Sequence, residues 1–189
     1  LFLQDPGFHH HTQKLTYAYP LVQYKQINEK IVVIGLCEYA EILAKKISKV
    51  DLIKVPNNEV RIQTYEIKNE KVCVTEKKQK YEFITPWIAF NENNYHNAKE
   101  MDNPELTLEL ERIIIGNTLS LLKGCNIFIN FRLKSKILDA RPVKTKAHGN
   151  AFVGFLGSFE LNATLPNFVG LGKSVSKGFG TIQRLKDDT

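Results

Sequence analysis

The sequence predicts an α+β fold built from two ferredoxin-like units in tandem. Two segments, 38–50 and 104–123, carry the apolar spacing of helices, and each lies between segments that alternate as strands do. In the second half the order is strand, helix, strand, strand, loop, strand, which is close to a β-α-β-β-α-β unit. At 189 residues, 43% of them hydrophobic, the chain can bury such a core. We therefore expect domains at 1–78 and 79–189, joined at a charged run of residues, 76–80.

The first half is predicted to contain two hairpins around one helix. Aromatic and β-branched residues interleave with polar ones over 15–27, and Asn28-Glu29 forms a turn before a return strand. A second hairpin is predicted from strands at 60–67 and 71–74. This arrangement lacks the opening strand and helix of a full ferredoxin-like unit, so we expect the start of this domain to be truncated.

The second half is predicted to open with a strand at 81–90 that contains Pro86, a residue typical of edges and bulges. Asn103 is the expected cap of the long helix, with Pro104 at its first position and Gly124 at its end. Further strands are predicted at 127–136, at 140–161 with an interruption, and at 181–185. No second helix is obvious, and Asn162–Val175 stands in its place.

Charge and composition favour an acidic partner and a cytoplasmic protein. The chain has 26 Lys and Arg against 20 Asp and Glu, a net charge of +6, which favours nucleic acid or another polyanion moderately. No apolar run approaches the roughly 20 residues of a membrane span, and no signal peptide opens the sequence. The three cysteines are widely spaced and are expected to be reduced thiols.

One glycine-rich stretch, residues 169–182, is the first candidate for a binding site. Its four glycines and two lysines are Gly170, Gly172, Lys173, Lys177, Gly178 and Gly180. Glycines let a phosphate approach the backbone N–H groups closely, and lysines add positive charge. A Walker loop is excluded, because Asn167 stands where its first glycine is required. RNA is thus a better candidate ligand than ATP, although a long hairpin loop that needs glycines for its turns is an equally good interpretation.

This stretch resembles the C-terminal glycine-rich signature of the RAMP superfamily, in particular the CRISPR repeat-processing endoribonucleases of Cas family six. Their pattern of Gly-apolar-Gly, about five residues rich in Lys and Arg, then Gly-apolar-Gly stands here as Gly170-Leu-Gly172 and Gly178-Phe-Gly180. The preceding run, Phe152 to Pro166, also resembles the strand that leads into that loop.

The other end of the chain carries a second match. His9-His10-His11, followed by Tyr17-Ala-Tyr-Pro-Leu-Val-Gln-Tyr-Lys25, is similar to the N-terminal signature of one branch of the same family. That signature is His-x-His, a short loop, then Tyr-x-Tyr-Pro, two apolar residues and Gln-Tyr-Lys. Together the two matches cover roughly a third of the chain and enclose almost all of it.

The resemblance implies a metal-independent endoribonuclease that cuts CRISPR precursor RNA within its repeats, without a cofactor. It implies His9, His11 and Tyr17 as catalytic residues and leaves a 2′,3′-cyclic phosphate and a 5′-OH. The chemistry suits these residue types, because an unperturbed histidine pKa near 6.5 allows it to act as base or acid at neutral pH. The six loop residues and Lys25 are the expected RNA contacts, with the basic stretch 132–148 either a solvated face or a further contact.

Several alternatives stay open at this point. The three histidines could be a plain surface loop or a metal-binding accident, although no carboxylates stand near them at ligand spacing. The chain could be a non-catalytic RAMP subunit that binds guide RNA in an effector complex, but the His-x-His signature favours the enzyme. An unrelated ferredoxin-like protein that binds a small molecule would leave the loop lysines unexplained. Whether the protein acts as a homodimer is not determined by these patterns.

Overall fold

The computed structural model describes residues 19–55, 58–91, 94, 98, 101–147 and 150–186. The three residues predicted to be catalytic, His9, His11 and Tyr17, lie outside the described residues, as do the other three histidines. In the described part of the chain, no helix is long and apolar enough to span a membrane.

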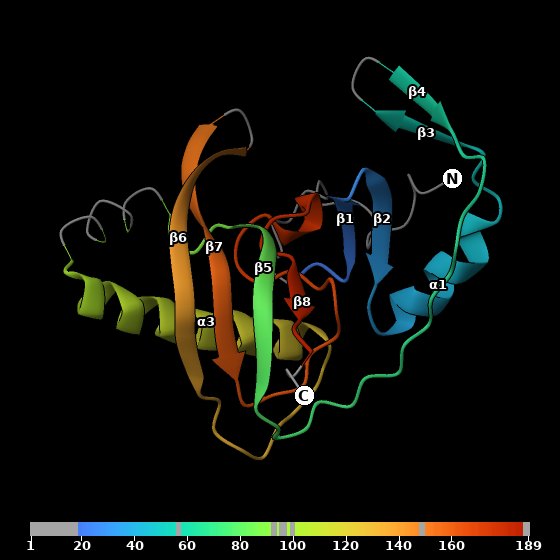
Figure 1. Cartoon of the computed structure of the whole chain (residues 1–189). Coiled ribbons are helices and arrows are strands. Elements are labelled where there is room, and N and C mark those ends of the chain that lie inside the picture. Colours follow the sequence, from blue (N-terminus) through green and yellow to red (C-terminus); the bar gives the residue numbers. More distant parts are fainter. Residues whose placement is uncertain are drawn as a thin grey trace, which may run out of the picture.

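Figure 1 shows a larger sheet with α3 behind it, and a smaller set of elements from the first half of the chain beside it. The described elements, in chain order, are β1 (Val22–Ile27), β2 (Lys30–Gly35), α1 (Glu38–Ile47), β3 (Leu52–Val55), β4 (Asn58–Arg61), β5 (Gln79–Trp87), α3 (Asn103–Gly124), β6 (Ser135–Ala147), β7 (Asn150–Leu161), the short 3-10 helix η2 (Val175–Lys177) and β8 (Ile182–Arg184).

The second half forms one four-stranded sheet with the order β6-β7-β5-β8, and all its neighbouring strands are antiparallel. Because α3 connects β5 to β6 and leaves room for β7 between them, this is the strand order of a ferredoxin-like unit. Residues 162–181, all described, stand in place of its second helix and hold only η2. The predicted fold class is confirmed.

The core of this sheet lies on the face that α3 covers. The aromatic rings of Tyr81 and Phe159 stack with centroids 5.6 Å apart, and Phe83 stacks on Trp87 at 4.8 Å. From the helix, Leu110 and Ile114 pack into the same buried cluster. Apolar side chains at helical spacing share one face of α3, and alternate residues of a strand share one face of the sheet, so these two apolar faces pack against each other.

In the first half, the hairpin of β1 and β2 is confirmed, with Ile27 opposite Lys30. Asn28 and Glu29 both have positive φ, 47° and 64°, as a tight hairpin turn requires. The helix α1 begins at its predicted first residue, Glu38, and ends at Ile47, three residues before the predicted end.

The second predicted hairpin was wrong. The strands that pair are β3 and β4, and residues 62–78, all described, contain no strand. Their apolar residues alternate with polar ones, but Tyr65 and Ile67 are 52% and 45% exposed. Alternation produces a strand only where a neighbouring strand and a covering layer accept the apolar face, and Tyr65 and Ile67 have neither.

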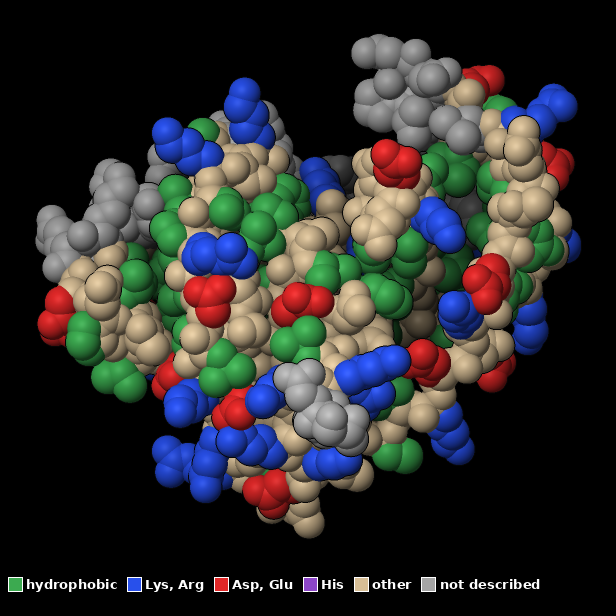
Figure 2. Space-filling view, viewed as in Figure 1, with side chains coloured by type: hydrophobic (Ala, Val, Ile, Leu, Met, Phe, Trp, Pro, Cys, Tyr) green, Lys and Arg blue, Asp and Glu red, His purple; other side chains and the backbone are tan. Residues whose placement is uncertain are grey.

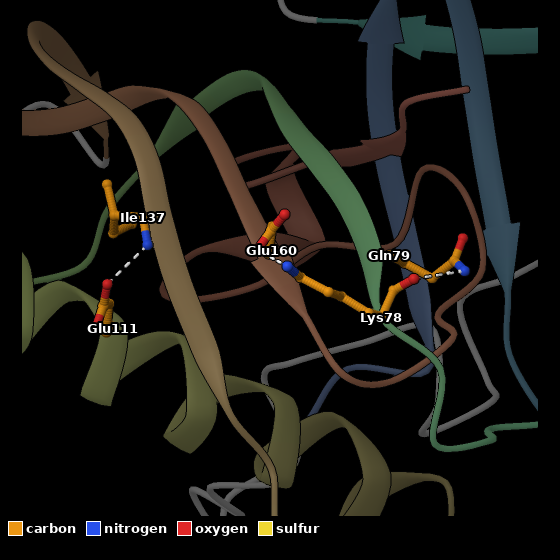
Figure 3. Close-up of polar contacts among 5 residues, drawn as sticks. All are labelled: Lys78, Gln79, Glu111, Ile137 and Glu160. Atoms are coloured by element: carbon orange, nitrogen blue, oxygen red, sulfur yellow. Dashed lines mark hydrogen bonds and ion pairs between the residues drawn. The ribbon is translucent and has the colours of Figure 1, made fainter. Parts of the chain in front are cut away.

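The predicted strand at 127–136 was also wrong, because β6 begins only at Ser135. The side chain of Asn162 bonds to the backbone of the preceding segment: its Oδ1 accepts from Lys134 N–H at 2.6 Å, and its Nδ2 donates to Arg132 C=O at 2.9 Å. At the start of the strand, the hydroxyl of Ser135 donates to Glu111 C=O of α3 at 2.7 Å. Two residues further on, the Glu111 carboxylate accepts from Ile137 N–H at 2.9 Å, as Figure 3 shows. The side-chain contacts of Asn162 and Glu111 thus set this boundary.

The start of α3 generates the first prediction. Asp102, and not the expected Asn103, caps the helix, because its Oδ1 accepts from Glu105 N–H at 2.9 Å. Asp102→Ala should lower the free energy of unfolding by about 1 kcal/mol, measured by urea denaturation. Asn103→Ala is the matched control and should change it by less than about 0.5 kcal/mol. A larger loss in the control would contradict this assignment of the cap.

Candidate nucleic-acid interface

The glycine-rich segment, defined here as residues 169–182, connects the long strand β7 to the last strand β8. It carries η2 and packs against β1, so it is one of the places where the two halves of the chain meet. Figure 1 shows η2 beside the β1–β2 hairpin, at one end of the larger sheet. Beside it, a hollow between the end of β1 and the sheet is lined by Gln26, Ile27, Asn28, Ile84, Thr85 and Gln183.

Gly170 is bonded to the first half of the chain through both of its backbone groups. Its N–H donates to Oε1 of Gln23 at 3.0 Å, and its C=O accepts from the hydroxyl of Tyr19 at 2.6 Å. The amide of Gln23 also donates to the Tyr19 hydroxyl at 2.8 Å. Gln23 is fully buried, and burial raises the pKa of Tyr19, so the Tyr19 hydroxyl stays neutral. The polar atoms of both side chains are paired.

Two residues further along β1, Lys25 reaches the other side of the segment. Its ammonium donates to the hydroxyl of Thr181 at 3.1 Å, and this hydroxyl donates in turn to Gly178 C=O at 2.9 Å. Thr85 of β5 donates to the same carbonyl at 2.7 Å and accepts from Thr181 N–H at 2.9 Å. This network connects β1, β5 and the glycine-rich segment.

Lys25 is only 4% exposed, and this burial lowers its pKa to about 7. Removing an ammonium from water disfavours the charged form, and among the described contacts only neutral oxygen atoms compensate. Lys25 thus lies next to the glycine-rich segment. Its predicted contact with RNA stays a prediction.

The glycines of the segment are required by close packing. A Cβ on Gly172, whose φ is 96°, would lie 2.7 Å from the indole nitrogen of Trp87. A Cβ on Gly180, with φ 61°, would collide with the carbonyl oxygen of Leu171, and one on Gly170 would lie 2.6 Å from Val175 Cβ. These positions therefore admit only glycine without a shift of their neighbours.

Several backbone N–H groups of the segment are used within the protein. Besides Gly170, the donors are Leu171 to Gly180 C=O, Lys173 to Ile88 C=O, Lys177 to Ser174 C=O, Gly178 to Val175 C=O and Gly180 to Pro86 C=O. The bonds to Ile88 and Pro86 hold the segment on the end of β5, and the others hold its own turns, including η2. An anion could bind these N–H groups only by breaking this packing. The exposed cationic side chains of the segment are Lys173 and Lys177.

Tyr19, Gln23, Thr85 and Thr181 were not predicted as site residues. Tyr19 and Gln23 stand inside the N-terminal signature and share the parity of Lys25 along the strand, which was a usable signal. Thr85 had no such signal, because its partners are backbone carbonyl and N–H groups. Thr181 lies inside the glycine-rich stretch, but its partner Lys25 is 156 residues away in the sequence. Within the described ranges, His, Cys, Asp and Glu side chains form no cluster of three that could hold a metal ion.

Two family models match this chain in succession. The model of the Cas6b N-terminal domain matches residues 1–73, and that of the Cas6b C-terminal domain matches residues 71–185. The chain belongs to the Cas6b family.

Solved structures support the Cas6b assignment over most of the chain. The crystal structure of Cas6b superposes with a TM-score of 0.86 at 32% identity, over 93% of this chain and 82% of the other. The crystal structure of the CRISPR RNA processing endoribonuclease Cas6b has a TM-score of 0.75 at 31% identity, over 89% and 83%. Csf5, a type IV Cas6 crRNA endonuclease, shares the fold alone, at 11% identity and a TM-score of 0.59.

A curated relative is also similar in sequence. The uncharacterized protein MJ0978 of Methanocaldococcus jannaschii is 41% identical over 121 residues, which is 64% of this chain and 82% of its own length. The two Cas6b domain models together account for both halves of the chain and for their order.

Gln23 generates the second prediction. Gln23→Met keeps the volume but leaves Gly170 N–H and the Tyr19 hydroxyl without this partner, so the free energy of unfolding should fall by about 1–3 kcal/mol in urea denaturation. Gln26→Met, at an exposed position of the same strand, is the control and should change it by less than about 0.5 kcal/mol. Equal losses in both variants would argue against the role of Gln23.

Lys25 generates the third prediction, on the pH dependence of stability. Below pH 7 its amine is protonated in the folded and the unfolded chain alike. Between pH 7 and about 10, only the unfolded chain still binds the proton, so wild type should gain stability relative to Lys25→Met as pH rises.

The gain should be at most about 1.4 kcal/mol per pH unit, measured as the difference between two urea series. Gln26→Met removes no titratable group and gives the baseline. A difference that stays flat from pH 7 to 10 would show that the ammonium is not desolvated in the folded protein.

Proposed function

We propose that the chain is a CRISPR RNA-processing endoribonuclease that cuts precursor RNA within each repeat. The observation that carries this proposal is the match of both Cas6b domain models, in order, over residues 1–185. A structure of the same family that covers 89% of this chain is named as a CRISPR RNA processing endoribonuclease. RNA is also the ligand that the positive net charge favours.

For the reaction, we propose cleavage by the RNA itself, with protein side chains moving the protons. A base takes the proton of the 2′-OH, the 2′-oxygen attacks the adjacent phosphorus, and an acid protonates the departing 5′-oxygen. The P–O5′ bond breaks and the 2′-O–P bond forms, which gives a 2′,3′-cyclic phosphate and a 5′-OH without any metal. His9 and His11 are suited to the two proton transfers, and Tyr17 can orient or protonate an oxygen.

The proposed catalytic residues gain support from the contacts of the residues that follow them in the sequence. Tyr19, two residues after Tyr17 in the sequence, is hydrogen-bonded to the glycine-rich segment. Gln23 and Lys25 hold the following strand on that segment as well. The segment is thus fixed relative to the chain that follows the catalytic candidates, as positioning of a phosphodiester for in-line attack requires.

For RNA binding, we propose that the glycine-rich segment acts as a rigid platform. Its packing holds the backbone, while the exposed Lys173 and Lys177 supply positive charge for the phosphates. A repeat that folds as an RNA hairpin would be recognised largely by its A-form shape and its phosphates. Lys25 also stays among the proposed RNA contacts, although it would first have to leave Thr181.

The fourth prediction tests this function directly. A labelled repeat RNA incubated in EDTA should be cut once by wild type. His9→Ala and His11→Ala should each slow the cut by about 10²–10⁴-fold, because each removes one proton transfer. A 2′-deoxy sugar at the cut site should abolish cleavage, since the attacking oxygen is then missing. His96→Ala is the control and should cut as wild type does.

The outcomes separate the alternatives. Tight binding of the repeat with no cut in any lane would replace the enzyme by a non-catalytic subunit that binds guide RNA. A cut that needs added magnesium, or that survives the deoxy sugar, would overturn the proposed chemistry and leave an RNA endonuclease of another kind.

A further inference from the structure

The end of the larger sheet that lies away from the glycine-rich segment is strongly basic. Three segments that are distant in the sequence contribute to this surface, which we call the basic end: Lys78, Lys80, Arg132, Lys134, Lys136, Arg184 and Lys186. All seven side chains are exposed. Figure 2 shows Lys and Arg side chains gathered at the lower end of this face, where β5 and β6 begin.

The pairing of the strands brings these residues together. Lys136 of β6 and Lys80 of β5 both stand opposite Glu160 of β7, one on each side of it. Leu185 N–H donates to Lys80 C=O at 2.9 Å, which puts Arg184 and Lys186 next to the start of β5. Asn162 holds the backbone of Arg132 and Lys134 to the end of β7.

Acidic residues offset only part of this charge. Glu160 is 13% exposed and already pairs with Lys78 at 2.6 Å, as Figure 3 shows, and Glu76 accepts from Asn162 at 3.2 Å. Glu82 lies two residues after Lys80 on β5, opposite Gln183 of β8. In the sequence, Asp187 and Asp188 follow Lys186, outside the described residues. Among the described residues, the cations of the basic end outnumber these neighbouring carboxylates.

The basic end and the glycine-rich segment cannot bind the same phosphate. The strand β5 runs from Gln79 at the basic end to Trp87, against which Gly172 packs. With a rise of about 3.3 Å per residue, these two points lie roughly 25 Å apart. An RNA held at Lys173 and Lys177 reaches the basic end only if it continues beyond that site.

We propose that the basic end binds the phosphate backbone of RNA that extends beyond the repeat held at the glycine-rich segment. This inference rests on the proposed function, because a precursor cut within a repeat necessarily continues as RNA on either side. Flexible lysine ammonium groups suit a backbone without fixed sequence, since they act as point charges. Binding of this kind is electrostatic, independent of sequence and sensitive to salt.

The fifth prediction uses a 20-nucleotide oligouridine as the probe and full-length protein. The triple variant Lys80→Gln, Lys136→Gln and Arg184→Gln removes three positive charges from the basic end. Its matched control, Lys45→Gln, Lys49→Gln and Lys68→Gln, removes three exposed charges from the first half of the chain. Affinities are measured by fluorescence anisotropy between 50 and 200 mM KCl.

Each neutralised phosphate of single-stranded RNA contributes about −0.7 to the slope of log K against log salt. The basic-end variant should therefore have a slope shallower by up to about 2. Its deficit in affinity should shrink by up to about 20-fold between the two salt concentrations. The control should keep the slope of wild type. Equal slopes for wild type and both variants, or equal losses in both variants, would overturn the proposal.

Two further arms locate the cause of a failure. If polyglutamate of similar length binds more tightly than the oligouridine and its binding shows the same loss in the basic-end variant, the surface is a site for an acidic protein and the proposal is overturned. Cleavage of the repeat RNA in EDTA is measured in parallel. If wild type cuts the repeat but both variants bind oligouridine as wild type does, only this inference fails. If no protein cuts while the slope still changes, the proposed function fails and the RNA-binding surface stands.

Discussion

The backbone of Gly170, held by two side chains from the other half of the chain, is the interaction on which the rest of the site depends. Gln23 accepts its N–H and Tyr19 donates to its C=O, so one peptide position fixes the strand β1 against the glycine-rich segment. Gln23 is fully buried and Tyr19 is partly buried, and each would leave a buried polar group unpaired if the strand moved. The two halves are therefore joined in one arrangement, because any slip breaks all of these bonds together.

Polar residues on the buried face of β1 also specify its register. The side chains of a strand alternate in direction, so a shift by one residue would turn Gln23 and Lys25 outward and bring Tyr24 and Gln26 inward. The buried ammonium of Lys25 costs stability, as its lowered pKa indicates, yet its bond to Thr181 is available in one register only. The interface thus accepts a cost in stability in return for a defined position.

The larger sheet carries two features at its opposite ends. At one end the packed glycines hold a rigid segment that exposes Lys173 and Lys177, and at the other end three separate segments contribute cations. The strand β5 connects them. At one end the C=O of Pro86, in the irregular part of the strand, accepts from Gly180 N–H, and at the other end lies Lys80. A rigid strand of this length keeps the two surfaces at a constant spacing, which suits a ligand that is long and regularly charged.

The sequence by itself determined the features that depend on neighbouring residues: the turn at Asn28-Glu29 and the helices α1 and α3. Only the tertiary structure decided which alternating segments became strands, because Tyr65 and Ile67 alternate correctly but have no layer to cover them. It also decided the distant partners of Gln23, Lys25 and Thr85, which are backbone groups or side chains more than 90 residues away. The basic end could not be predicted either, because charges from three distant segments become neighbours only when the strands pair.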